Sequence, residues 1–146
     1  MQIRVTKEFS FEMSHQLDGY NGKCRNIHGH SYRLFVTVIG EPIADVNHPK
    51  CGMVVDFTDL KKLVADCIIE PLDHTLLLRT GSATAQALQH TGTKIAMVGY
   101  QPTCENMVAH FAQTLQPLLP KNVRLHSIRL YETATSHATW VANDNK

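Results

Sequence analysis

The first seventeen residues alternate between apolar and polar positions. Counting from Ile3, the odd positions are apolar apart from Lys7, whereas the even positions from Gln2 to Ser14 are polar. A period of two is the pattern of a half-buried strand, because successive side chains point to opposite faces of a sheet. The pattern therefore predicts a long strand from Ile3 to Leu17, with His15 on its apolar face.

A second alternation runs from His30 to Ile39, with one face made of Tyr32, Leu34, Val36 and Val38. By the same parity His28 and His30 extend this face if the strand begins early enough. The segment 18–23 between the two runs is rich in turn residues, which predicts antiparallel neighbours joined by an elaborated hairpin loop. The end of the first strand then meets the start of the second.

The rest of the chain predicts two helices followed by two strands. One helix begins after the N-cap candidate Asp56 and ends at Pro71, and the other begins near Thr103. The strands cover Val123–Thr133 and His137–Ala142, and Arg79–Gln101 receives no assignment. The order ββααββ predicts an α+β fold, with a four-stranded antiparallel sheet and both helices on one face. We expect one domain over residues 1–146.

The composition is that of an ordinary globular protein and favours a small-molecule partner. Hydrophobic residues make up 43% of the chain, and 14 basic and 13 acidic residues leave a net charge of +1. No basic stripe indicates nucleic-acid binding, and no long apolar run indicates a membrane span or a signal peptide. We therefore expect a cytoplasmic protein. The four cysteines contain no Cys-x-x-Cys pair, which argues against a disulfide framework or a four-cysteine zinc site.

Nine histidines are the compositional outlier. His28 and His30 point the same way because they are two apart on a strand, and His15 lies at the facing end of the neighbouring strand. Three converging imidazoles with an open fourth position are typical of a catalytic zinc ion. The alternative is that these are hydrogen-bonded structural histidines. The others apart from His74 have no partner at metal spacing and are interpreted as surface or structural residues: His48, His90, His110, His126 and His137.

Three further features suggest proton chemistry. Cys24 lies between Lys23 and Arg25, just before the histidine pair, where cationic neighbours and a metal would favour the thiolate. Asp73 and His74 form a carboxylate–imidazole pair of the kind used in acid–base relays. Glu132 follows two apolar positions on one strand face, so its carboxylate is expected to point inward and to need donors. Each also has a simpler interpretation: an incidental loop cysteine, a common turn sequence and a solvent-facing glutamate.

Six runs that extend over nearly the whole chain carry a family pattern: Phe9–His15, Cys24–His30, Gly52–Phe57, Pro71–His74, Pro102–Asn106 and Tyr131–Thr133. In these runs the chain resembles the 6-pyruvoyltetrahydropterin synthase family and its bacterial 6-carboxytetrahydropterin synthase branch. The resemblance implies the tunnelling fold, in which trimers form a barrel, two trimers stack into a hexamer, and the active sites lie between subunits.

The resemblance also implies roles for individual residues. His15, His28 and His30 would bind zinc, Cys24 would accept a proton, and Asp73 with His74 would form the relay. Glu132 would bind the pterin ring, with Thr103 and Glu105 as weaker substrate-binding candidates. The implied substrate is 7,8-dihydroneopterin triphosphate. Its side-chain hydroxyls would bind the metal, which acts as a Lewis acid.

One local feature separates the branches of this family. Three residues lie between Cys24 and His28, as in the bacterial enzyme, which converts the substrate to 6-carboxytetrahydropterin, acetaldehyde and triphosphate in queuosine and deazapurine biosynthesis. The alternatives are the pyruvoyl synthase, which has a longer spacer in animals, and a non-catalytic, zinc-stabilised pterin-binding protein. Two departures from the family pattern are Gln16, where many relatives have arginine, and a longer segment Arg79–Gln101.

Overall fold

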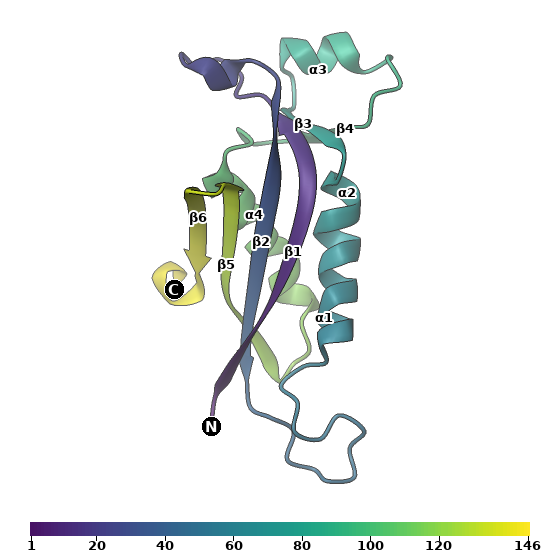
Figure 1. Cartoon of the computed structure of the whole chain (residues 1–146), viewed down its shortest axis with the longest axis vertical. Helices are drawn as coiled ribbons and strands as arrows, with labels where there is room; N and C mark the ends of the chain where they lie inside the picture. The colour runs from purple at the N-terminus through teal and green to yellow at the C-terminus, as the bar shows by residue number, and fades with distance from the viewer.

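The two alternating runs form the longest strands of the protein. The computed structural model describes residues 1–146, with β1 at Ile3–His15 and β2 at His28–Gly40. They pair antiparallel over their full lengths, so that His15 lies opposite His28 (Figure 1). β1 ends two residues before the predicted end, because the backbone N–H of Leu17 donates to the carbonyl of Cys24 across the loop. This loop contains a short 3₁₀ turn, η1, at Lys23–Arg25.

The sheet has six strands in the order β4-β3-β1-β2-β5-β6, so the prediction of a four-stranded antiparallel sheet was wrong. β5 (Val123–Thr133) and β6 (Ser136–Val141) pair antiparallel as expected. The additional strands β3 (Thr75–Arg79) and β4 (Ile95–Val98) extend the other edge in parallel pairing. The first four residues of β3 are all buried, so this strand lacks the alternation that reveals a half-buried strand.

The predicted helices lie on one face of the sheet (Figure 1). The first is continuous through α1 (Phe57–Val64), a π-helical turn η2 (Ala65–Ile69) and α2 (Glu70–Leu72). Its N-cap is Asp56, as predicted, but Pro71 lies inside its last turn and does not end it. The second is α4 (Cys104–Leu115), capped by Thr103 and followed by the 3₁₀ turn η3 (Gln116–Leu118).

The segment without a predicted structure contains β4 and a further short helix, α3 (Ala83–Leu88), which lies at the upper end of the molecule in Figure 1. The chain ends in a 3₁₀ turn, η4 (Ala142–Asn145). None of the helices combines the length and the apolar character that a bilayer span requires.

A single cluster of 22 buried residues fills the space between the helices and the inner face of the sheet. Tyr32, Leu34, Val36 and Val38 contribute the predicted apolar face of β2, and each is fully buried. Burying a side chain of this size contributes about 1.5–3 kcal/mol, so this face fixes the register of the long strands. His15, 1% exposed, continues the same face at the end of β1.

Candidate metal centre and adjoining pocket

The strand register brings three imidazoles together at one end of the sheet. The Nε2 atoms of His15 and His28 lie 3.1 Å apart, and His30 completes a group whose ligand atoms all lie within 4.8 Å of one another. His28 and His30 point the same way from β2, while His15 faces them from β1. This confirms the convergence that strand parity predicts.

Backbone carbonyls fix the tautomers of two of these rings. The Nδ1 of His15 donates to the carbonyl oxygen of Pro102 at 2.8 Å, and the Nδ1 of His28 donates to that of Asn26 at 2.7 Å. A carbonyl oxygen only accepts, so each Nδ1 carries a proton, and the Nε2 of a neutral ring in this tautomer presents a lone pair. Hydrogen bonds of this kind orient metal-binding histidines in proteins. Two opposed lone pairs at 3.1 Å are suited to a shared cation.

The third histidine supplies an independent sign of a missing partner. The Nε2 of His30 is buried and forms no hydrogen bond, although buried polar atoms are nearly always satisfied. Burial lowers the pKa values of both His15 and His30, against the opposing effect of the Glu132 charge. Both rings are therefore held in the neutral form that binds metals. The donor set and the unpaired nitrogen fit a metal ion.

Glu132 lies beside the three histidines. Its Oε1 is 3.4 Å from the Nε2 of His15 and 3.6 Å from that of His30. The pairing of β5 with β6 shifts register between Tyr131 and Thr133, which places Glu132 at an irregular position. Such irregularities often redirect a side chain toward a functional site. Because His15 lies on the inner side of the sheet, its contact with Glu132 places this carboxylate on the inner side too, as the parity of β5 predicts.

A pocket of about 270 Å³ adjoins the histidines and contains most of the other candidate residues. Cys24, Thr103, Glu105 and Glu132 line it, together with His137, which was interpreted from the sequence as a surface or structural residue. Cys104 also borders it, but burial raises the pKa of this thiol to about 11, and its Sγ donates to the carbonyl of Leu130. Cys24 is only partly buried and is the accessible thiol of this pocket.

Asp73 and His74 lie outside this pocket, in the short connection between α2 and β3. They are held against β1, where the backbone N–H of Glu12 donates to Asp73 Oδ1 at 2.9 Å and that of His74 donates to the Glu12 carbonyl. The first of these bonds, and then the His74 ring at 3.0 Å, hold the pKa of Asp73 below its usual range. His74 adopts a φ of +55°, which is rare for a residue with a side chain.

The relay pair and Cys24 do not share a pocket within one chain. His74 lines a different hollow, which His30 also borders, together with Glu12, Ser14 and Ser31 from the uncovered face of the sheet. The expectation that Cys24, Asp73 and His74 act together is therefore not met inside a single copy. The exposed His74 side chain is available to a neighbour.

Tyr32, which the sequence placed on the apolar face of the second strand without a functional role, lies beside His15 and His30. Its ring packs edge-on against those of His15 and His30, and its buried hydroxyl forms no hydrogen bond. Burial raises its pKa well above the usual range. Tyr32 lies two residues after His30 on β2 and therefore on the same strand face, which was the signal in the sequence for this contact. The carbonyls of Pro102 and Asn26 were not predictable, because every residue has a carbonyl.

Comparison with known proteins places these features in a family. The model of the family described as 6-pyruvoyl tetrahydropterin synthase matches residues 4–143. The 6-carboxy-5,6,7,8-tetrahydropterin synthase of Haemophilus influenzae is 37% identical over 138 residues, covering 92% of this chain and 95% of that protein. The human 6-pyruvoyl tetrahydrobiopterin synthase is 34% identical over 144 residues, covering 90% of this chain and 86% of that protein.

The solved structures support the fold. The 6-pyruvoyl tetrahydropterin synthase of Caenorhabditis elegans superposes with a TM-score of 0.70 at 21% identity, covering 97% of this chain and 96% of that one. An uncharacterized protein of Wolinella succinogenes gives a TM-score of 0.78 at 19% identity, covering 97% and 99% of the two chains. Since the family model spans nearly the whole chain and relatives above 30% identity cover most of it, this chain belongs to the 6-pyruvoyl tetrahydropterin synthase family.

Proposed function

We propose that this chain is a zinc-dependent 6-carboxy-5,6,7,8-tetrahydropterin synthase, a lyase that converts 7,8-dihydroneopterin triphosphate to 6-carboxytetrahydropterin, acetaldehyde and triphosphate. The observation that carries the proposal is the convergence of three imidazoles beside a pocket lined by Cys24 and Glu132. The bacterial relatives with this name support it, as does the three-residue spacing between Cys24 and His28.

In this proposal each residue of the pocket has a distinct task. Zinc bound by the three histidines would act as a Lewis acid toward the side-chain hydroxyls of the substrate. Glu132 accepts hydrogen bonds from the pterin ring, which relieves the cost of its partial burial. Cys24, in the turn η1 between β1 and β2, accepts a proton from the substrate side chain. Thr103 and Glu105 border the ring site.

We further propose that Asp73 and His74 complete the site of a neighbouring copy in a homo-oligomer, a trimer or a dimer of trimers. Two features support this arrangement. Neither residue lines the pocket that contains Cys24, and the histidine side chain is 78% exposed. The Glu12 backbone holds the Asp73 carboxylate in its ionised form, so that it can orient the adjacent imidazole.

The assigned role of Cys24 is tested by Cys24→Ala. We expect the variant to keep one zinc ion per chain and to lose turnover of dihydroneopterin triphosphate, because the ligands are intact and the proton acceptor is gone. Cys51→Ala, which removes an exposed thiol from the loop between β2 and α1, is the matched control and should retain full activity. Undiminished turnover by Cys24→Ala would overturn the role of this thiol.

Product analysis separates the two enzymatic alternatives. The carboxy synthase cleaves the side chain and releases acetaldehyde, whereas the pyruvoyl synthase retains all side-chain carbons. We therefore expect one acetaldehyde per triphosphate, measured by mass spectrometry of the pterin product together with an aldehyde assay. A pyruvoyl product without acetaldehyde would instead assign the chain to the activity named for its human relative.

A further inference from the structure

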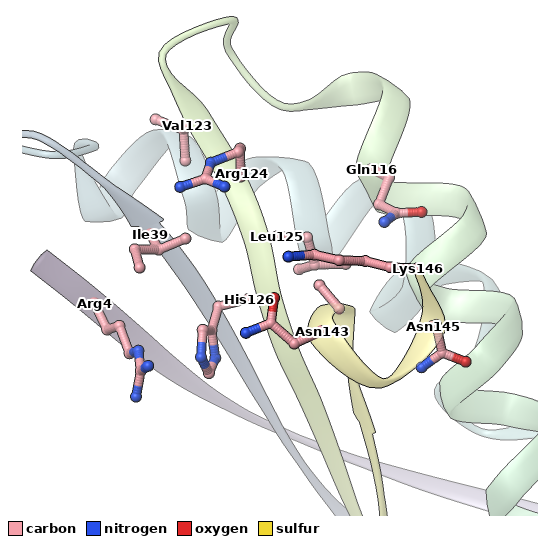
Figure 2. Close-up of a pocket in the computed structure, with 11 residues that line it drawn as sticks. Arg4, Ile39, Gln116, Val123, Arg124, Leu125, His126, Asn143, Asn145 and Lys146 are labelled. Carbon is pink, nitrogen blue, oxygen red and sulfur yellow. The ribbon is translucent and has the colours of Figure 1, made fainter. Parts of the chain in front are cut away.

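A second pocket lies at the opposite end of the long strands from the histidines. It has a volume of about 500 Å³ and is framed by the starts of β1 and β5 and by η4 (Figure 2). Arg4 lines it, eleven residues before His15 on β1, which corresponds to roughly 35 Å along an extended strand. It is therefore separate from the candidate metal centre. Its volume is in the range of small-molecule sites.

The pocket exists because β6 is shorter than its partner. The last β6 residue, Val141, pairs with Ser127, after which the chain turns into η4. The edge of β5 before Ser127 therefore has no strand beside it. The other edge of β5 pairs with β2, which in turn pairs with β1. Arg124, Ile39 and Arg4 are direct register partners on these three strands. The two arginine Cα atoms are thus about 10 Å apart, a separation that long side chains can close around one ligand.

A β-bulge adds a third nitrogen group. Thr37 pairs with Ser127 and Val38 pairs with Leu125, so His126 is an extra residue on β5. Bulges of this kind redirect side chains. His126 lines the pocket together with Arg4 and Arg124 (Figure 2). Partial burial, and then the charge of Arg4, lower the pKa of His126, which shows that the cationic field reaches its ring.

The charged side chains that line this pocket are all basic. Its charged lining residues are Arg4, Arg124 and Lys146, with no aspartate or glutamate, although the whole chain has a net charge of only +1. Arg4 forms no ion pair or side-chain hydrogen bond, and Arg124 forms only one, a 3.4 Å contact to Gln2. By contrast, Arg33 and Arg79 each bind a carboxylate at 2.7–2.8 Å.

We propose that this pocket binds a phosphorylated small molecule of about nucleotide size, with Arg4, Arg124 and His126 contacting its phosphate oxygens. Guanidinium groups match phosphate in a bidentate geometry and lose little hydration when they do so. The amides of Gln116, Asn143 and Asn145, on the far side of the pocket, supply donors and acceptors for the uncharged part of the molecule. The proposal does not depend on the function assigned to the histidine site.

The test is isothermal titration calorimetry of the metal-loaded protein with AMP, inorganic tripolyphosphate and citrate. We expect AMP and tripolyphosphate to bind, with affinity that falls as salt rises, and citrate to bind more weakly. The double variant R4Q/R124Q should lose at least about tenfold in affinity for AMP, since two charge-assisted contacts are removed. Both side chains are exposed, so the fold should be unaffected.

Arg129→Gln is the matched control. Arg129 is an exposed arginine on β5 that does not line the pocket and hydrogen-bonds to Thr139. This variant should bind AMP like the unmodified protein, which separates a local site from general loss of positive charge. The proposal is overturned if neither phosphorylated probe binds at millimolar concentration. It is also overturned if R4Q/R124Q loses less than tenfold in AMP affinity, or if citrate binds as well as AMP.

Discussion

At the scale of single residues, the contact between His15 and His28 is the most informative feature. The Nε2 atoms of the two rings lie 3.1 Å apart, and the Nδ1 of each ring donates to a backbone carbonyl. Two neutral rings in this tautomer direct both lone pairs into the space between them, which is the arrangement that binds a cation. The unpaired Nε2 of His30 completes the same donor set.

His28→Ala therefore tests the metal centre. The side chain is only partly buried, so we expect the variant to fold. Its zinc affinity should fall by more than about 100-fold, because changes to groups that merely orient a ligand already cost 10–100-fold. Metal analysis after dialysis against a competing chelator measures this. His48→Ala, in an exposed loop, is the control. Equal zinc content in both variants would contradict the assignment.

Tyr32 permits a second residue-scale prediction. Its ring stacks on Phe11 at a centroid distance of 5.1 Å, while its hydroxyl is buried without a hydrogen bond. Tyr32→Phe keeps the packing and removes an unsatisfied group, so the free energy of unfolding should change by less than about 1 kcal/mol. Tyr32→Ala leaves a cavity and should cost about 3–5 kcal/mol. Urea denaturation measures both, and a large loss in Tyr32→Phe would reveal a missing hydroxyl partner.

At the scale of elements, Thr103 links a helix to the pocket. It borders the pocket, but its hydroxyl also accepts the backbone N–H of Asn106 and so caps α4. Thr103→Ala should therefore destabilise the protein by about 1 kcal/mol, and Thr103→Ser, which retains the hydroxyl, should restore most of this. Thermal denaturation of the pair measures the cap. Equal stability of the two variants would show that the hydroxyl does not contribute to it.

The elements also show what a sequence can and cannot predict. The long strands, their pairing and both main helices followed from local periodicity and capping, and the convergence of His15, His28 and His30 followed from strand parity. β3 was missed because a short buried strand has no alternation, and β4 because it has only four residues. Both pair in parallel with segments distant in the sequence, which local patterns do not reveal. The separation of His74 from Cys24 depends on that same non-local pairing.

At the scale of the whole molecule, the core and the metal centre are distinct parts of the structure. The 22-residue cluster packs the helices against the inner face of the sheet along most of its length. The histidines lie at one end of the sheet and contribute one fully buried residue, His15. We therefore expect a metal bound there to stabilise the fold by mass action without being required for folding. This distinguishes a catalytic zinc ion from a structural one, on which folding itself depends.

Metal removal tests this distinction in the intact protein. After dialysis against dipicolinate we expect turnover to disappear, while circular dichroism and the sedimentation mass, a multiple of the 16.4 kDa chain, stay unchanged. The melting temperature should fall by roughly 5–10 °C, the size of effect expected when a bound ligand is lost from a domain of this length. Added zinc should restore activity. Unfolding or dissociation on chelation would instead favour the zinc-stabilised, non-catalytic alternative, since the histidines would then serve the fold itself.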